Sequence, residues 1–264
     1  MHDLLKIGIL DSGVGGFSVL REIRALLPGA PIHYVADSSW CPYGNKPGDV
    51  IRDRVAQLAD YLLGEGAEIL VIACNSATIH AVGSLRATYP IPVVGMEPAV
   101  KPAAELTRSG VVGVLATEAS IAGEKFHQLV NTHAQGIRVI TRPCPRFVEL
   151  VEAGILSGPE ADAAVQEALA PLLEADADVL VLGCTHYPFL RPVIEEQTPE
   201  GVTIIDTGPA VARRVASLMP DSPDLHKENA EIHIETTGSL EQLNLLLAKL
   251  LPGIKATTTA AKLP

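Results

Sequence analysis

The chain alternates short apolar runs with segments of helical period, and this alternation limits the folds open to it. Between the apolar runs, large apolar residues recur every three or four positions, as in Leu20, Ile23 and Leu27. Parallel strands need long crossover connections, usually helices, which cover both faces of the sheet. The alternation therefore predicts an α/β fold with a mostly parallel sheet. Its first strands are expected at residues 5–10, 32–37, 67–74 and 91–96.

The same pattern begins again in the second half of the chain. Cys74 and Cys184 each end the third expected strand of their half, at nearly equal distances from Asp11 and Thr117. This weak internal repeat predicts two pseudo-symmetric lobes, each a mostly parallel sheet flanked by helices. Strands are expected at residues 110–117, 137–144, 178–184 and 202–208, with helices at 120–133 and 160–175, and a last strand and helix at 230–236 and 239–251.

Composition excludes several classes of protein. The net charge is −11, which opposes nonspecific binding to nucleic acid because such binding needs lysine and arginine. No apolar run is long enough to span a membrane, and the amino-terminal stretch lacks the basic start of a signal peptide. The four cysteines form no C-x-x-C pair and are too few for a disulfide scaffold in a chain of 264 residues. We therefore expect a cytoplasmic protein with no nucleic-acid or membrane partner.

The segments "VIACNSATIH" and "VLGCTHYPFL" carry the strongest functional signal. Each places a thiol between the carboxyl end of an apolar strand and the start of an expected helix, where α/β sheets bind ligands. The amino terminus of a helix favours a thiolate. Two such thiols could invert a stereocentre, because one removes a proton from a carbon while the other supplies a proton to the opposite face. Asp11 and His186 are candidates to adjust the pKa values of the two thiols.

These motifs resemble those of the glutamate racemases, a family of the cofactor-independent aspartate/glutamate racemase superfamily. The matching stretches lie in family order over roughly residues 7–215: "GILDSGVGGFSVLREI", "PYGNK", "VIACNSAT", "VVGMEPAVKPA", "FVELVEAG", "LGCTHYPFL" and "DTG". The resemblance implies interconversion of L- and D-glutamate in a cleft between the lobes, with no cofactor and no metal. It also implies a role in supplying D-glutamate for peptidoglycan synthesis, cell wall biogenesis and cell shape, and a possible homodimer.

The resemblance assigns residues and domains. Cys74 and Cys184 are implied as the catalytic thiols for the D- and L-enantiomer respectively, assisted by Asp11 and His186, with Glu152 as an acidic residue near the second thiol. Ser76 departs from the more common threonine but keeps the hydroxyl. The first lobe is implied to be discontinuous, residues 1–97 plus 208–264, with the second at 98–207. The implied substrate-binding residues are Asp11, Ser12, Pro42, Tyr43, Gly44, Asn75, Ser76, Thr185 and His186.

Three alternatives remain open from the residues themselves. One is a racemase of the same superfamily acting on aspartate or another amino acid. A second is a hydrolase with a Cys184–His186 pair, although the i, i+2 spacing is expected to keep the imidazole away from the thiol and Cys74 would have no task. A third is a two-lobed amino-acid-binding protein, which needs no matched thiols. Cys41 and Cys144 are read as inert and structural, and no histidine or cysteine cluster has the spacing of a metal site.

Overall fold

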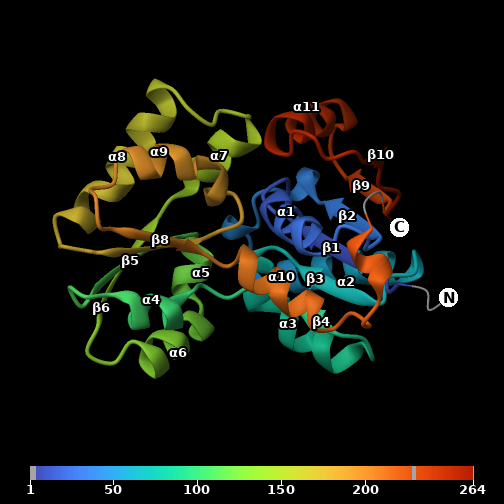
Figure 1. Ribbon diagram of the computed structural model, residues 1–264, viewed down its shortest axis with the longest axis horizontal. Coiled ribbons are helices and arrows are strands. Elements are labelled where there is room, and N and C mark those ends of the chain that lie inside the picture. The colour runs from blue at the N-terminus through green and yellow to red at the C-terminus, as the bar shows by residue number, and fades with distance from the viewer. Residues whose placement is uncertain (1–3, 228–229, 264) are drawn as a thin grey trace. The chain divides into compact units, whose positions relative to one another are not determined.

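A computed structural model describes residues 4–227 and 230–263 (Figure 1). The chain divides into two compact units, residues 1–96 with 208–264 and residues 97–207. Each unit contains a parallel sheet flanked by helices, which confirms the predicted α/β class. Residues 1–3, where the amino-terminal stretch considered as a signal peptide begins, lie outside the described residues. No helix among the described residues is both long and apolar enough to cross a membrane.

The first unit is built on a six-stranded sheet in the order β10-β9-β2-β1-β3-β4, with every neighbouring pair parallel. Strands β9 and β10 come from the carboxyl-terminal part of the chain, which returns to the first sheet. The elements are β1 (Ile7–Asp11), α1 (Phe17–Leu26), β2 (Ile32–Ala36), α2 (Gly48–Gly64), β3 (Ile69–Ile72), α3 (Asn75–Thr88), β4 (Val93–Val94), α10 (Gly208–Ala216), β9 (Ile232–Thr236), α11 (Leu240–Leu250) and β10 (Thr257–Ala260). Three short 3-10 segments accompany them, η1 (Ser38–Trp40), η2 (Tyr43–Asn45) and η4 (Pro223–His226).

The second unit is built on a four-stranded parallel sheet in the order β6-β5-β7-β8. Its elements are α4 (Val100–Leu106), β5 (Val111–Ala116), α5 (Glu118–Ala122), α6 (Glu124–His133), β6 (Arg138–Pro143), α7 (Pro145–Glu152), α8 (Pro159–Leu173), β7 (Val179–Gly183), the 3-10 segment η3 (Tyr187–Leu190), α9 (Arg191–Glu196) and β8 (Thr203–Asp206). The order β6-β5-β7-β8 repeats the order β2-β1-β3-β4 of the first sheet. The predicted pseudo-symmetry is therefore present in the topology, and Cys74 and Cys184 follow the corresponding strands β3 and β7.

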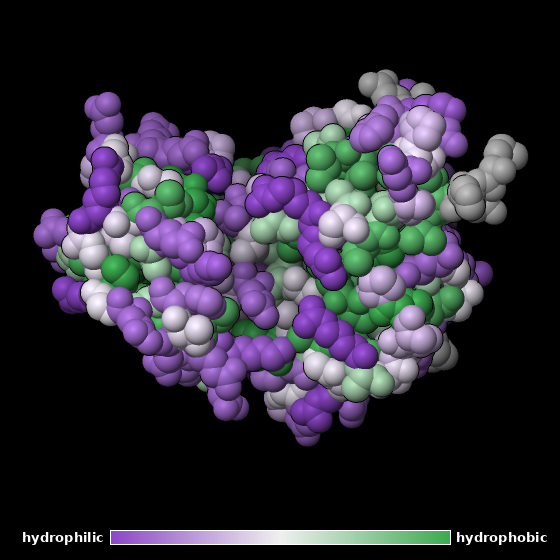
Figure 2. Space-filling view, turned by 60° about the horizontal axis from the view of Figure 1, so that its bottom comes forward, coloured by the Kyte–Doolittle hydropathy of each residue, from purple (hydrophilic) through white to green (hydrophobic). Residues whose placement is uncertain are grey.

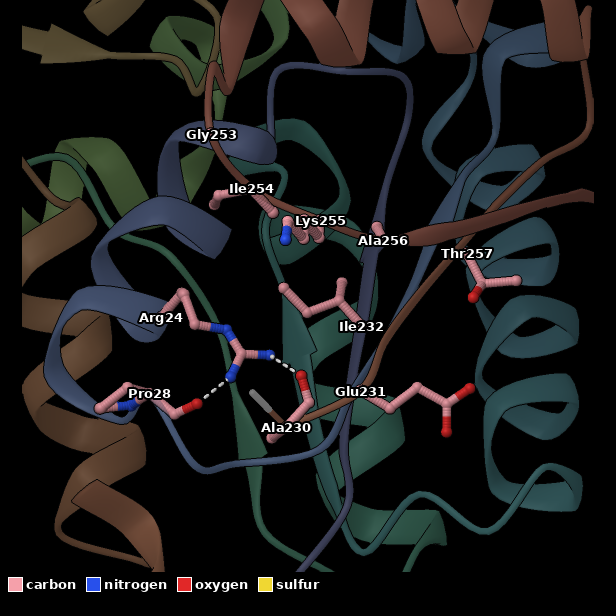
Figure 3. Close-up of a pocket in the computed structure, with 10 residues that line it drawn as sticks. All are labelled: Arg24, Pro28, Ala230, Glu231, Ile232, Gly253, Ile254, Lys255, Ala256 and Thr257. Atoms are coloured by element: carbon pink, nitrogen blue, oxygen red, sulfur yellow. Dashed lines mark hydrogen bonds between the residues drawn. The ribbon is translucent and has the colours of Figure 1, made fainter. Parts of the chain in front are cut away.

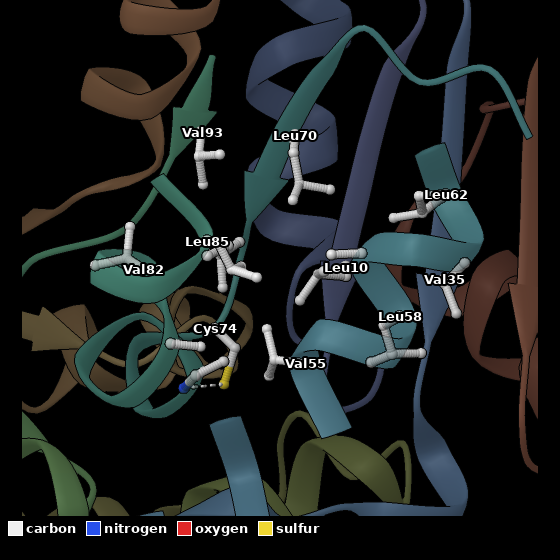
Figure 4. Close-up of a cluster of buried hydrophobic side chains, with 14 of the residues drawn as sticks. Leu10, Val35, Val55, Leu58, Leu62, Leu70, Cys74, Val82, Leu85 and Val93 are labelled. Carbon is white, nitrogen blue, oxygen red and sulfur yellow. Dashed lines mark hydrogen bonds between the residues drawn. The ribbon is translucent and has the colours of Figure 1, made fainter. Parts of the chain in front are cut away.

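Apolar side chains cover both faces of the first sheet. On one face, Leu10 and Val35 pack with Leu58 and other residues of α2 and α3 in a fully buried cluster (Figure 4). On the other face, the ring of Phe17 from α1 lies 5.0 Å from that of Tyr34. Each large apolar side chain buried in this way contributes roughly 1.5–3 kcal/mol relative to exposure. The sheet is thus a rigid base, and the loops at its carboxyl edge are free to carry function.

The face drawn in Figure 2 mixes hydrophilic residues with groups of hydrophobic ones. Among the described residues, the exposed large hydrophobic side chains belong to helices α1, α2, α4 and α11. Single exposed apolar residues of this kind are normal on a folded protein and need no functional explanation.

Two expected helices differ from the structure. The helix expected over residues 120–133 is interrupted at Gly123, whose extended backbone separates α5 from α6. The helix expected after the polar residues that follow Cys184 begins only at Arg191, because a tight turn and the 3-10 segment η3, which contains Pro188, come first. Helices α4 and α10 and strand β10 are elements that the sequence patterns did not predict. The different structures after Cys74 and Cys184 matter for the two thiols.

Candidate active site

Cys74 is the N-cap residue of helix α3. Its sulfur accepts a hydrogen bond from the backbone N–H of Ala77 at 3.5 Å, as Figure 4 shows, and its thiol lies 3.8 Å from the Ser12 hydroxyl oxygen, to which it can donate. The residue is only 6% exposed and also contacts the apolar cluster under α2 and α3. A backbone N–H at a helix amino terminus stabilises negative charge on sulfur. The Ala77 N–H can therefore stabilise a thiolate at Cys74 when the thiol loses its proton.

Asp11 lies at the carboxyl end of β1 and is fully buried. Its Oδ2 accepts a hydrogen bond from the backbone N–H of Gly16 at 2.7 Å, which folds the Ser12–Gly16 loop onto the carboxylate. Gly16 is required there, since a Cβ atom would lie 2.6 Å from the Tyr34 hydroxyl and 2.9 Å from the Asp11 Cβ. This loop sets the position of Ser12 beside Cys74.

Asn75 and Ser76 occupy the first turn of α3 and are almost completely buried. Neither the amide nitrogen nor the amide oxygen of Asn75 has a hydrogen-bond partner among the described residues. Leaving such a group unpaired costs roughly 1–3 kcal/mol, so buried polar groups without partners call for an explanation. A polar ligand bound next to Cys74 would explain why the Asn75 amide has no partner among the described residues.

The Pro42–Gly44 segment is anchored by a buried carboxylate. The Tyr43 hydroxyl donates to Asp37 Oδ2 at 2.6 Å, and Arg54 donates to both oxygens of Asp37 at 2.9 and 2.7 Å. Burial and the adjacent negative charge of Asp37 raise the pKa of Tyr43 well above its usual value, so the phenol stays protonated. The Tyr43 side chain thus serves as an anchor, and the backbone of Tyr43 and Gly44 is the part left for a ligand.

Asp37 and Arg54 were not among the residues expected at this site. The only available signal was an aspartate at the carboxyl end of the strand expected at residues 32–37.

Cys184 follows β7 in a tight turn closed by a hydrogen bond from the Tyr187 N–H to the Cys184 carbonyl at 3.1 Å. His186 Nδ1 lies 3.6 Å from the Cys184 sulfur, and His186 Nε2 lies 2.7 Å from Glu152 Oε1. The expectation that the i, i+2 spacing keeps this imidazole from the thiol is wrong. It assumed a continued strand or helix, whereas the turn folds His186 back over Cys184.

The resulting Cys184–His186–Glu152 chain is held by packing behind it. Glu152 is the last residue of α7, and the ring of Phe147 on the same helix lies 5.0 Å from that of Tyr187. The Tyr187 hydroxyl donates to the Cys144 carbonyl at 3.0 Å, just before α7 begins. These contacts fix α7 against the turn that carries His186. An imidazole between a sulfur and a carboxylate can accept the thiol proton while the carboxylate stabilises the imidazolium.

The remaining expected residues have simpler surroundings. Thr185 is buried between Cys184 and His186. Cys144 is buried, and burial raises its pKa to about 12, so it is a thiol at neutral pH and fits the structural role expected for it. Cys41 is half-buried beside Pro42.

A cavity of about 560 Å³ in the first unit contains none of the expected residues (Figure 3). Its walls come from the end of α1, from residues 230–232 and from residues 253–257, and Arg24 within it donates to the carbonyl oxygens of Pro28 and Ala230. The chemistry of the strand ends, rather than cavity size, therefore identifies the candidate site.

Comparison with known proteins agrees with this geometry. The family model of the Asp/Glu/hydantoin racemases matches residues 11–215. The chain belongs to this family. It is a racemase, and therefore an isomerase.

Individual relatives cover nearly the whole chain. Glutamate racemase of Ectopseudomonas mendocina is 48% identical over 247 residues, which are 93% of this chain and 94% of the relative. The crystal structure of Escherichia coli glutamate racemase in complex with L-glutamate and activator UDP-MurNAc-ala matches with a TM-score of 0.87 and 33% identity, covering 98% of this chain and 99% of the other. Picrophilus torridus aspartate racemase shares the fold, with a TM-score of 0.52 and 16% identity over 84% of this chain and 97% of its own.

Proposed function

We propose that this racemase interconverts L- and D-glutamate by proton transfer at Cα between two thiols. The observation that carries the proposal is the placement of Cys74 and Cys184 at the carboxyl ends of the corresponding strands β3 and β7. Each thiol has its own means of proton control, a helix amino terminus for Cys74 and the His186–Glu152 pair for Cys184. A hydrolase would need only the Cys184–His186 pair. A binding protein would need neither thiol arrangement.

In the proposed reaction from L-glutamate, the Cys184 thiolate removes the Cα proton and becomes a thiol. The electron pair left on Cα is delocalised into the substrate carboxylate. The Cys74 thiol then delivers its proton to the opposite face of Cα and becomes a thiolate, which yields D-glutamate. The reaction from D-glutamate runs in reverse, and proton exchange with water restores the starting thiol and thiolate.

The side chains around the thiols suit the binding of a carboxylate without an arginine cluster. Asn75 offers a buried amide without a partner among the described residues, and Ser12, Ser76 and Thr185 offer buried hydroxyls. Hydrogen bonds to a charged group are worth about 1.5–3 kcal/mol each. These groups would also stabilise the negative charge that develops on the substrate carboxylate when Cα loses its proton.

Glutamate is preferred over aspartate as the proposed substrate because relatives named glutamate racemase are 48% identical over 93% of this chain and 53% identical over 81% of it. The comparison with the aspartate racemase, at 16% identity, supports the common fold alone. We also propose, from the resemblance to the family, that the D-glutamate serves peptidoglycan synthesis and that no cofactor takes part.

The test uses purified protein dialysed against a chelator and incubated in D₂O with L-glutamate, D-glutamate or L-aspartate. Circular dichroism should show racemisation of both glutamate enantiomers, and mass spectrometry should show one deuterium at Cα. Faster conversion of aspartate than of glutamate would indicate that aspartate is the substrate. Binding of glutamate without any deuterium exchange would reject the enzyme mechanism in favour of a binding protein.

A further inference from the structure

Two histidines and a glutamate meet on one face of the first sheet, under helix α2. In the parallel pair β2–β9, His33 lies directly opposite His233, and Glu235 lies two residues further along β9. Side chains two residues apart on a strand point to the same face. The register alone therefore brings the three side chains together, although they come from opposite ends of the chain.

The donor atoms of these three side chains have the spacing of a metal site. His33 Nε2 lies 3.0 Å from Glu235 Oε2, His233 Nε2 lies 3.7 Å from Glu235 Oε1, and one ligand atom from each residue can be chosen so that all lie within 4.8 Å of one another. Tetrahedral zinc with bonds of about 2.1 Å holds its ligand atoms about 3.4 Å apart, a value between the two measured distances. The His33 and His233 rings are stacked with centroids 4.7 Å apart, so one imidazole must rotate for both nitrogens to face a single ion.

The surroundings hold the Glu235 carboxylate in place and leave a path by which an ion can reach it. The Tyr61 hydroxyl donates to Glu235 Oε2 at 2.7 Å, and the Thr259 hydroxyl donates to Glu235 Oε1 at 2.9 Å. Metal sites use such outer partners to orient their ligands. The His33 side chain is buried, whereas that of His233 is 30% exposed, so an ion can reach the cluster from the His233 side.

We propose that His33, His233 and Glu235 form a zinc-binding site. Two imidazole nitrogens and one carboxylate are a ligand set that zinc prefers, and water would fill the remaining position. Bound zinc would take the place of the contact between His233 Nε2 and the Thr259 hydroxyl, which are 2.7 Å apart.

The site is separate from the thiols and goes beyond the racemase reaction. It would link β2 to β9 and so fasten the returning carboxyl-terminal segment to the amino-terminal part of the first unit. Its role would be structural.

The test is calorimetric titration of the full-length, chelator-treated protein with Zn²⁺, with thermal unfolding measured with and without the ion. One zinc per chain should bind and raise the Tm. His233→Gln should weaken binding at least tenfold and remove the Tm shift. His127→Gln, which changes an exposed histidine of the second unit, is the matched control and should leave both unchanged.

Cysteine thiols also bind zinc, so Co²⁺ serves as a spectroscopic probe of the ligands. The proposed site should give visible absorption without a thiolate charge-transfer band, and Glu235→Gln should weaken Co²⁺ binding as well. Failure to bind, a dominant thiolate band, or binding that His233→Gln leaves intact would overturn the proposal. Racemase activity should persist after zinc is removed, so the outcome is independent of the test of the proposed function.

Discussion

Replacement of Glu152 by glutamine should slow racemisation by weakening one side of the proton transfer. The carboxylate lies 2.7 Å from His186 Nε2 and would stabilise the imidazolium formed when Cys184 gives up its proton. A hydrogen bond to a charged group contributes about 1.5–3 kcal/mol and a neutral one about 0.5–1.5 kcal/mol. Their difference, together with the lost charge, gives a penalty of about 1–2 kcal/mol. Since about 1.4 kcal/mol is tenfold in rate, kcat/KM should fall roughly 5- to 30-fold.

The two directions of racemisation cannot reveal which thiol is affected. The enantiomers have equal free energies, so the equilibrium constant is one and kcat/KM must fall equally in both directions. A partial reaction separates the two sides. A chlorinated glutamate analogue loses hydrogen chloride after proton abstraction alone, so Glu152→Gln should slow elimination from the L-analogue through Cys184 and spare elimination from the D-analogue through Cys74.

The matched control is Glu149→Gln, on the same helix α7. Glu149 is exposed and pairs with Arg146 at the surface, so its replacement should leave both elimination rates unchanged. An equal loss on both analogues in Glu152→Gln, or no loss on either, would refute the assigned role of Glu152.

Three further predictions concern reactivity, acid stability and the loop beside Asp11. Burial raises the pKa of Cys144 to about 12, so iodoacetamide at pH 8 should modify it far more slowly in the native than in the unfolded protein, and equal rates by mass spectrometry would contradict this. Burial alone would raise the pKa of Asp178, but hydrogen bonds, with that from Thr107 the strongest, lower it to about 2. Its contribution to stability is therefore present above about pH 4 and lost as the pH falls toward 2, and an NMR titration midpoint near 4 would contradict this. Gly16→Ala places a Cβ 2.6 Å from the Tyr34 hydroxyl and should lower the free energy of urea unfolding by about 1–3 kcal/mol together with activity, whereas unchanged unfolding would show that the loop can adjust.

The order of strands and helices was predictable because each depends on local periodicity. An apolar run of four to eight residues forms a strand whichever strand it later pairs with, so the positions of Cys74 and Cys184 at strand ends could be predicted before the structure was known. The contact between His186 and Cys184 could not be predicted in this way. It depends on the backbone angles of a three-residue turn, and the hydrophobic period carries no information about them.

Contacts between distant segments were also beyond the sequence patterns. The cluster of His33, His233 and Glu235 exists because β9 returns to pair with β2, and nothing in either strand alone specifies that neighbour. The anchoring of Tyr43 by Asp37 and Arg54 likewise requires α2 to lie beside the end of β2.

Single replacement of each thiol by serine tests the two-thiol mechanism most directly. A serine hydroxyl is far harder to deprotonate than a thiol, so neither Cys74→Ser nor Cys184→Ser should racemise glutamate. Cys74→Ser should still eliminate hydrogen chloride from the L-analogue through Cys184, and Cys184→Ser should still eliminate it from the D-analogue through Cys74. Racemisation by either variant at nearly the wild-type rate, or loss of elimination from both analogues in both variants, would contradict the mechanism.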